Sequence, residues 1–402
     1  MSALHSILFA LLAGWISIGG LELWSQRGAV VLRPDSLPED LRASAKLHGV
    51  ADVLALPRVS IIVPARNEEE ILPVALASLM NLNYPDYEVI LVDDASTDGT
   101  GALADDWAAR DSRLRVIHNS ALPTGWTGKV HALHLGAAAA SGEWILATDA
   151  DMVFHPAILR LAISTAQRQN VHMLSILPQV DAATFWDKTV LPAFAMILGT
   201  AFPLRLVNNP RSKRAFAAGG FILMVRRELE ELGGYERLRG TVVEDLRTAE
   251  MFKRGGRRTF VTLSDGLLET RMYQDGLELW EGLSRSAFEG SGRSVIKVLG
   301  ALATGAFMVL LPWACLLAGL VAAHVPASHR ADHATLLLSA ATLAVSSLVY
   351  MPLVRYCRVP LWYVLTLPVA YAFYAAAAVY SAAISLAGPG VIWKGRHYRS
   401  AT

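Results

Sequence analysis

Two hydrophobic patterns divide the chain. Four apolar stretches contain no Lys, Arg, Asp or Glu, and each is long enough to cross a bilayer, which takes roughly 20 residues of helix. These stretches are Met1–Leu21, Val298–Ala323, Thr335–Val354 and Leu361–Trp393. The polar block Ser25–Lys297 lies between the first and the second. The pattern therefore predicts one polar domain flanked by membrane helices.

The same pattern gives four expected regions. We expect a transmembrane anchor over residues 1–24, one domain over 25–297, transmembrane helices, about three, over 298–393, and a basic tail over 394–402. A signal peptide is the alternative for the first stretch, but the stretch lacks a basic start and a small-x-small cleavage motif, which favours a retained anchor. Arg355 and Arg358 favour a cytoplasmic polar domain by the positive-inside rule. The basic tail fits that arrangement only if the last stretch bends within the membrane, and this point stays open.

Inside the polar block, short β-branched runs alternate with segments of helical spacing. Val59–Ala65 is the first such run, and apolar residues recur on one helical face over 68–80. This alternation is typical of βαβ units on a mostly parallel sheet. Further strands are expected at 88–93, 114–118, 144–148, 221–225 and 259–263, and further helices at 101–110, 130–140, 156–168 and 243–253.

A largely apolar stretch over 185–206 interrupts this alternation. It contains Asp187, Lys188, Pro192 and Pro203. Such a segment could lie on a membrane surface or line an entrance for a lipid, or it could be an ordinary core helix. Both interpretations stay open.

Acidic residues follow the expected strands. Ligands of parallel sheets bind at the carboxyl ends of the strands, so these positions are candidate ligands. Asp149 and Asp151 stand two residues apart on a turn, where both can face one cavity. Their hard oxygen ligands suit Mg²⁺ or Mn²⁺ bridging a diphosphate. A solvated turn would explain an isolated Asp-x-Asp, but the position after the fourth expected strand favours a metal site.

The loop 93–99 has two interpretations. The first half of an EF-hand calcium loop is matched by Asp94, Ser96, Asp98 and Gly99. Such a loop requires a preceding helix and a closing Glu. Here a β-branched run precedes the loop and Asp105 occupies the closing position. We therefore expect carboxylates that accept hydrogen bonds from a base and a ribose, with Asp94 as the best candidate.

Composition removes several function classes. The net charge is +1, and no basic run is interleaved with aromatic residues, which argues against a nucleic-acid partner. Gly128–Lys129 is not a phosphate loop, because Pro123 and Val130 replace the required Gly and Ser or Thr. Lys129 could still reach a phosphate as a point charge, or it could be a solvated lysine.

Glu244 and Asp245 open the expected helix 243–253. Acidic residues in a first turn are ordinary partners of the helix dipole. The alternative is catalytic, because group transfer to a hydroxyl needs a base near the acceptor.

Five motifs, in this order, resemble those of family 2 glycosyltransferases with the GT-A fold. They are Val63-Pro64-Ala65-Arg66-Asn67-Glu68, Val92-Asp93-Asp94-Ala95-Ser96-Thr97-Asp98, Asp149-Ala150-Asp151, Gly219-Gly220-Phe221 and Glu244-Asp245. The resemblance covers Val59 to Gly256, most of the polar block. It implies an α/β protein with a Rossmann-like, mostly parallel sheet, joined to the predicted transmembrane helices.

The resemblance also implies a reaction and a site. The reaction would be an inverting transfer from a nucleotide-diphosphate sugar, with a UDP-sugar expected, and the cofactor would be Mg²⁺ or Mn²⁺. Asp94 would contact the base, Asp151 would coordinate the metal with Asp149 beside it, and Asp245 would be the catalytic base next to Glu244. The rest of the expected donor site comprises Pro64, Ala65, Asn67, Glu68 and Lys129.

The acceptor is expected to be a lipid. Processive synthases of this family carry Gln/Arg-x-x-Arg-Trp after the base, whereas Trp280–Arg285 reads WEGLSR here. The layout of spans is similar to that of the lipid-directed branch, in particular the bacterial hopanoid-associated glycosyltransferases, with ceramide and carotenoid glycosyltransferases as neighbours. It implies a multi-pass protein of the bacterial inner membrane with a cytoplasmic catalytic domain. A processive polysaccharide synthase and a non-catalytic nucleotide-sugar-binding scaffold remain the alternatives.

Overall fold

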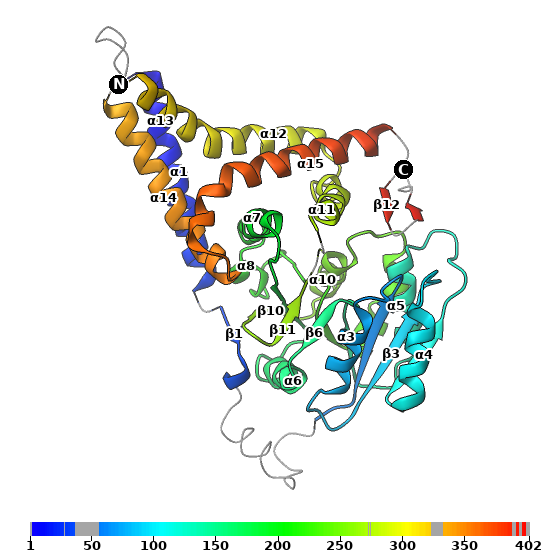
Figure 1. The fold of residues 1–402 in the computed structure, drawn as a ribbon. Helices are drawn as coiled ribbons and strands as arrows, with labels where there is room; N and C mark the ends of the chain where they lie inside the picture. Colours follow the sequence, from blue (N-terminus) through cyan, green and yellow to red (C-terminus); the bar gives the residue numbers. More distant parts are fainter. Residues whose placement is uncertain are drawn as a thin grey trace. The chain divides into compact units, whose positions relative to one another are not determined.

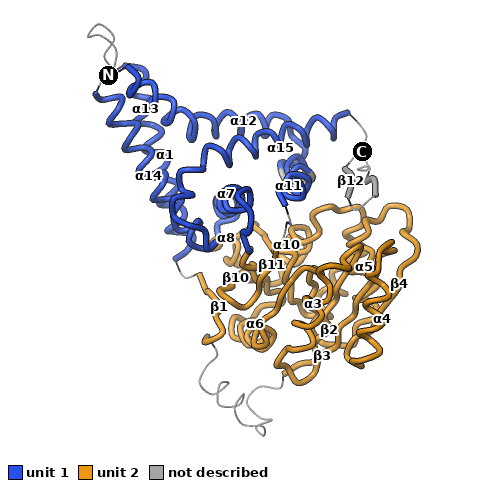
Figure 2. Tube along the Cα trace, viewed as in Figure 1, with its two compact units in different colours: residues 1–27, 181–203, 273–392 blue, residues 28–180, 204–272, 393–402 orange. Residues whose placement is uncertain are grey.

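The computed structural model describes residues 2–27, 29–36, 56–271, 273, 275–322, 333–387, 391–393 and 396–398. They form two compact units (Figure 2). The helical unit comprises Met1–Arg27, Asp181–Pro203 and Tyr273–Ile392, and the sheet unit comprises Gly28–Val180, Leu204–Met272 and Trp393–Thr402. The expected basic tail 394–402 lies outside the described residues apart from 396–398.

An eight-stranded sheet forms the centre of the sheet unit (Figure 1). Its neighbouring strands are parallel, except that β9 runs antiparallel to β5 and β7. The predicted α/β class with a mostly parallel sheet is therefore confirmed. In spatial order the strands are β1 (Val31–Leu32), β10 (Thr259–Ser264), β7 (Met173–Leu177), β9 (Ile222–Val225), β5 (Trp144–Ala147), β2 (Val59–Ala65), β3 (Tyr87–Asp93) and β4 (Leu114–His118).

Helices connect these strands close to the expected positions. The helix expected from residue 68 begins later, at Leu72, with Pro73 in its first turn, where a missing N–H costs nothing. The main connecting helices are α3 (Leu72–Met80), α4 (Thr100–Arg110), α5 (Gly128–Ala139), α6 (Ile158–Arg168) and α10 (Glu244–Arg254).

Apolar clusters cover both faces of the sheet. Successive residues of β2 point to opposite faces, so Ile61 packs in one cluster and Ile62 in the other. Helix α5 lies so close to β2 that a Cβ at Gly136 would be 2.3 Å from Cγ2 of Ile62. This contact fixes α5 on the sheet and sets its N-terminus, which carries Lys129, at the carboxyl edge of the strands.

A three-stranded sheet adjoins that edge. Its order is β6 (Met152–Phe154), β11 (Leu268–Thr270) and β8 (Gln179–Val180), with β6 antiparallel and β8 parallel to β11. The sequence pattern did not predict these strands, because runs of two or three residues carry no periodicity. Pairing of Thr270 with Met152 brings Thr270 next to Asp151.

Within the described ranges, the helical unit contains four helices that are long and apolar enough to cross a membrane. At most 28% of the most apolar window of each is buried, so most of its apolar surface faces outward. The spans are α1 (Ala3–Gln26), Val295–Ala322, α14 (His333–Tyr356) and Leu361–Ala387. They match the four predicted stretches, but the last ends at Ala387, and Val391–Trp393 forms a short strand, β12.

Two helices within the expected domain 25–297 are grouped with the helical unit by their contacts. They are α7 (Phe185–Ala201) and α11 (Gly276–Gly290). Their aromatic residues pack against α15 (Leu367–Ala387), with Trp186 and Trp280 each 5.4 Å from the ring centre of Phe373. These two helices are therefore grouped with the helical unit because they contact its apolar helices, although they lie in the polar block of the sequence.

Candidate functional site: a carboxylate cluster at the strand ends

Asp149 and Asp151 lie in the turn between β5 and β6. Thr270 Oγ1 donates a hydrogen bond to Asp151 Oδ2 at 2.9 Å. Asp151 Oδ1 is buried and has no hydrogen-bond partner among the described residues. Burial, with the charges of Asp149 and Glu68, raises the pKa of Asp151 to about 7. A buried carboxylate oxygen without a partner beside a second carboxylate is a donor set that suits a hard divalent cation.

Lys129, at the start of α5, joins two of the carboxylates. Its Nζ lies 2.6 Å from Asp149 Oδ1 and 2.5 Å from Glu244 Oε1. The Glu244 side chain is only 10% exposed and that of Lys129 23%. Burial opposes the charge of Lys129, but Asp149 and Glu244 outweigh it and raise the pKa of Lys129 well above its usual range. The lysine is therefore an ammonium ion held between the two motifs.

Asp245 follows Glu244 in the first turn of α10. Its Oδ1 accepts a hydrogen bond from the Leu246 N–H at 2.7 Å. Burial and the charge of Glu244 raise the pKa of Asp245 to about 7, against the opposing effect of Lys129. A carboxyl with this pKa can both accept and release a proton near neutral pH.

Gly219 marks the point where these side chains converge. A Cβ at this position would lie 3.3 Å from Asp149 Oδ2, 3.3 Å from Lys129 Nζ and 3.7 Å from Asp245 Oδ2. The glycine thus borders the cluster with backbone alone, and a side chain there would enter it. Beside it, Thr148 Oγ1 donates to the Gly220 carbonyl at 2.7 Å, which ties the end of β5 to this loop.

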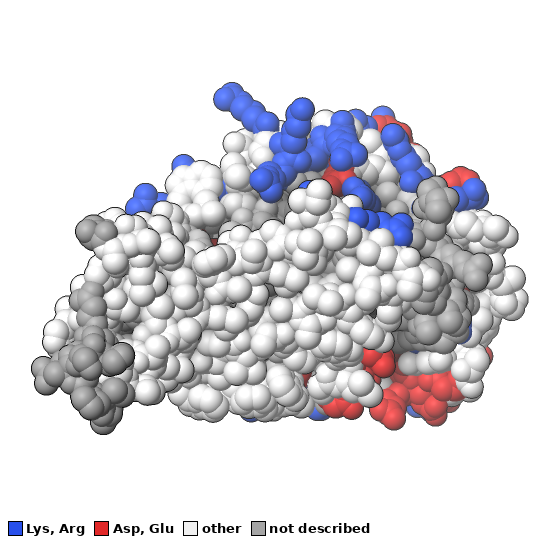
Figure 3. All heavy atoms as spheres, turned by 90° about the horizontal axis from the view of Figure 1, so that it is seen from above, with Lys and Arg blue, Asp and Glu red and all other residues white. Residues whose placement is uncertain are grey.

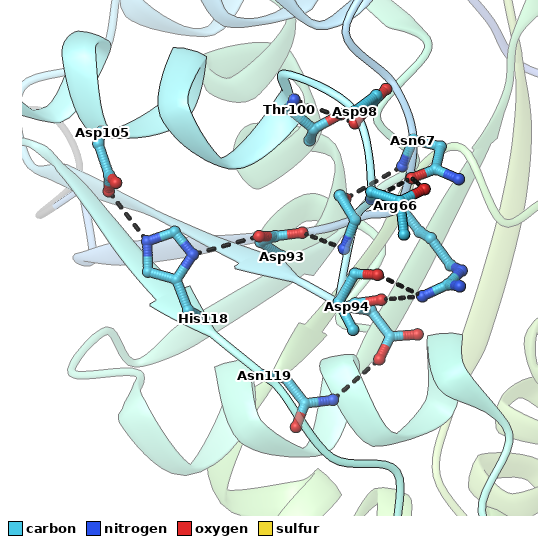
Figure 4. Close-up of polar contacts among 12 residues, drawn as sticks. Arg66, Asn67, Asp93, Asp94, Asp98, Thr100, Asp105, His118 and Asn119 are labelled. Atoms are coloured by element: carbon cyan, nitrogen blue, oxygen red, sulfur yellow. Dashed lines mark hydrogen bonds and ion pairs between the residues drawn. The ribbon is translucent and has the colours of Figure 1, made fainter.

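The loops after β2 and β3 hold Asp94 (Figure 4). Asn119 Nδ2, directly after β4, donates to Asp94 Oδ1 at 2.8 Å and lies 3.2 Å from His131 Nδ1. Arg66 donates to the backbone carbonyls of Asp94 and Ala95 at 2.5 and 2.7 Å. Asp94 is therefore fixed through both its side chain and its backbone. The sequence pattern missed Asn119, although its place directly after a strand was an available signal.

Asn67 and Glu68 act on the same loop through backbone contacts. Asn67 adopts a left-handed φ of 52°, which Asn tolerates better than most residues, and its Oδ1 accepts from Thr97 N at 2.8 Å. Glu68 N donates to Thr100 Oγ1 at 2.8 Å. Pro64 and Ala65 lie at the end of β2, paired with Val92 and Asp93.

Asp93, unlike Asp94, is engaged on the other side of β3. Its Oδ1 accepts from Ser96 N at 3.0 Å, and its Oδ2 lies 3.2 Å from His118 Nδ1. His118 Nε2 is 3.0 Å from Asp105 Oδ1 of α4 (Figure 4). Asp105 and Asp93 raise the pKa of His118. The contacts among Asp93, His118 and Asp105 tie the loop after β3 to α4. Asp105 therefore has a partner in His118, and it does not act as the closing residue of a calcium loop.

The structure thus brings the predicted residues together in two groups at one edge of the sheet. Asp149, Asp151, Lys129, Glu244 and Asp245 form the first group. The second group is Pro64, Ala65, Asn67, Glu68 and Asp94. The charge of Glu68 acts on Asp151, which connects the two groups. Among the described residues, no set of three or more His, Cys, Asp or Glu is already gathered around a metal position.

The fold is that of a GT-A glycosyltransferase. It is similar to the solved structure of the mannosyltransferase PcManGT from Pyrobaculum calidifontis, in complex with GDP-Man and Mn²⁺, with a TM-score of 0.50. The two chains are 23% identical, and the alignment covers 91% of this chain and 98% of that one. At this identity the likeness concerns the fold alone.

Residues 60–233 match the family model described as Glycosyl transferase family 2. This part of the chain is therefore a family 2 glycosyltransferase domain, as its motifs predicted. The chain is 33% identical to a beta-monoglucosyldiacylglycerol synthase of Nostoc sp. over 40% of this chain and 32% of that protein. It is 26% identical to the 4,4'-diaponeurosporenoate glycosyltransferase of Staphylococcus aureus over 61% of this chain and 64% of that protein. The chain thus spans about a third of the first relative.

Lys129→Met tests the energetic role of the cluster. It would leave Asp149 and Glu244 without their shared cation, and removing one partner of a buried ion pair costs about 3 kcal/mol or more. We expect a clear drop in thermal midpoint in detergent. The matched control is Arg110→Met, which breaks the exposed pair with Asp106 and should cost at most about 1 kcal/mol. Equal midpoints for the two variants would show that Lys129 does not hold the cluster together.

Proposed function

We propose that the protein is a membrane-anchored, inverting glycosyltransferase that moves one sugar from a UDP-sugar to the hydroxyl of a lipid. The observation that carries this proposal is the convergence on Gly219, where oxygens of Asp149 and Asp245 and the Lys129 ammonium lie within 4 Å of one point. A cation site and a base with a raised pKa side by side are what transfer from a diphosphate to a hydroxyl requires.

Asp151 and Asp149 are the proposed ligands of a Mg²⁺ or Mn²⁺ ion. The partnerless Oδ1 of Asp151 supports this assignment, and Thr270 orients the other oxygen. When bound, such an ion neutralises charge on the leaving diphosphate. Lys129 adds a second positive charge at the same place and holds Asp149.

Asp245 is the proposed base that takes the proton of the acceptor hydroxyl. Glu244 then has a different task from the catalytic one that the sequence suggested. Its carboxylate holds Lys129, and its charge helps to raise the pKa of Asp245. We therefore assign Glu244 as a positioning residue.

Asp94 is the proposed contact to the base of the nucleotide, together with the donor-site residues Pro64, Ala65, Asn67 and Glu68. Asn119 already donates to Asp94 Oδ1. A carboxylate accepts several hydrogen bonds, so Asp94 could bind an N–H of the base beside Asn119. The uridine nucleotide is proposed from the resemblance of the motifs.

The acceptor is proposed to be a lipid, with polycyclic hopanoids as the first candidates. The helices that could cross a membrane support a membrane-borne substrate. The names of two relatives also refer to a diacylglycerol and to a carotenoid derivative. Because nucleotide sugars are cytoplasmic metabolites, we propose a multi-pass protein of the bacterial inner membrane with the sheet unit in the cytoplasm.

The proposed reaction is tested with purified full-length protein, labelled nucleotide sugars, Mn²⁺ and a bacterial lipid extract. We expect one labelled lipid carrying a single sugar, formed from a UDP-sugar and resolved by thin-layer chromatography. Products with many sugars would support a processive synthase. No labelled lipid from any donor would support the non-catalytic scaffold.

Asp245→Asn keeps the size of the side chain but cannot accept a proton, so we expect turnover to fall at least about 1000-fold while UDP binding is kept. In the wild type, the carboxyl is protonated below its pKa of about 7. We therefore expect kcat/KM to fall about tenfold per pH unit below that value. Wild-type turnover in Asp245→Asn would remove Asp245 as the base.

Asp151→Ala removes the proposed metal ligand with the partnerless oxygen. Calorimetry should show Mn²⁺-dependent UDP binding weakened by about 100-fold. Mutating a residue that only hydrogen-bonds to a metal ligand typically lowers metal affinity 10- to 100-fold, and removing a ligand itself should have at least the upper end of that effect. Asp106→Ala, an exposed carboxylate on α4, is the control and should bind as the wild type does. Unchanged Mn²⁺ dependence in Asp151→Ala would contradict the metal assignment.

A further inference from the structure

A basic loop, defined here as residues 205–214, lies on the surface of the sheet unit. Arg205, Arg211, Lys213 and Arg214 are all exposed, and the loop contains no Asp or Glu. Figure 3 shows that Lys and Arg side chains gather on one face of the molecule with few acidic side chains among them. The proposed transfer reaction uses none of these residues.

The loop is held in shape by Lys253 of α10. Its Nζ lies within hydrogen-bond distance of four backbone carbonyl oxygens, those of Val207, Asn209, Ser212 and Arg214, at 2.5, 3.0, 3.2 and 2.7 Å, and its three N–H groups are shared among them. Asn208 binds the edge of β10, where its side chain exchanges hydrogen bonds with Val261 N and O at 2.7 and 2.9 Å. The carbonyls are therefore turned inward, and the basic side chains are presented outward on a fixed backbone.

The place of the loop in the chain suggests its partner. Only Phe202 and Pro203 separate α8 (Leu204–Val207), where the loop begins, from α7, and α7 is a largely apolar helix packed with the helices that could cross a membrane. Clusters of Lys and Arg directly beside such helices bind anionic lipid headgroups, and each basic residue contributes separately. Arg suits phosphate because its planar fork can donate two parallel hydrogen bonds.

We infer that the basic loop binds the anionic phospholipid headgroups of the bilayer and so holds the sheet unit at the membrane surface. This inference rests on the proposed membrane anchoring, but not on the identity of donor or acceptor. Such binding would keep the proposed active site near the bilayer surface, where it could reach the hydroxyl of a lipid acceptor.

A fluorophore on the loop tests this contact. The full chain carries Pro210→Cys, with Cys315→Ala and Cys357→Ala to remove the native thiols, and is reconstituted in nanodiscs. The discs contain phosphatidylcholine alone or an equimolar mixture with phosphatidylglycerol, plus a lipid with a nitroxide on its headgroup. We expect strong quenching only in the anionic discs, and loss of quenching at high salt.

Paired charge variants decide whether the loop carries the contact. Arg211→Gln with Lys213→Gln should lower the headgroup-bound population about tenfold or more. The control Arg110→Gln with Arg115→Gln removes the same charge from exposed residues at the β4 edge of the sheet and should change nothing. Hydrogen exchange of the peptide 204–214 in unlabelled protein repeats the comparison if the cysteine disturbs the loop.

Three outcomes would overturn the inference. Equal quenching in both kinds of disc would do so, and so would quenching that survives Arg211→Gln with Lys213→Gln. A fluorescence change with polyglutamate but not with anionic lipid would instead indicate an acidic protein partner. Failure to incorporate into discs at all would contradict the membrane anchoring on which the proposed function depends, so the two failures are distinguishable.

Discussion

Repulsion among carboxylates at one edge of the sheet is the constraint on which the site depends. Asp149, Asp151, Glu244 and Asp245 come from two segments nearly a hundred residues apart, and the Lys129 ammonium contacts one carboxylate from each. Without that cation, folding would bring uncompensated negative charge into a buried space, which is costly. The close packing of α5 on β2 at Gly136 places the lysine, and the backbone at Gly219 leaves room for the cluster. Core packing and site electrostatics are thus coupled.

The same charges divide the work among similar residues. Asp149 is paired with Lys129, while Asp151 has a buried oxygen without a hydrogen-bond partner among the described residues, which is why Asp151 is the proposed metal ligand. Glu244 is paired with Lys129, while the pKa of Asp245 is raised to about 7, which is why Asp245 is the proposed base. Asp93 fastens a loop to His118, while Asp94 stands beside Asn119. In each pair, the two carboxylates differ in their hydrogen-bond and ion-pair partners, and the proposed roles follow from that difference.

The two units differ in how much of their apolar surface they bury. The sheet unit buries its apolar residues on both faces of a mostly parallel sheet, whereas the helical unit leaves most of the apolar surface of its long helices exposed. Two of the places where the chain passes between the units, at Asp181 and Tyr273, follow strands β8 and β11 of the small sheet, in which Thr270 contacts Asp151. The connection at Tyr273 therefore begins close in sequence to the contact of Thr270 with Asp151.

The sequence by itself determined the strands and helices with strong periodicity, the four apolar spans, the order of the motifs and the residues expected in the site. Those features are local, because hydrophobic period and turn chemistry act over a few residues. Only the tertiary structure decided the reversed strand β9, the three-stranded sheet, the contacts of α7 and α11 with the apolar helices, and the partners of Lys129, Thr270 and Asn119. These depend on contacts between residues far apart in the chain, and no pattern within a single segment records them.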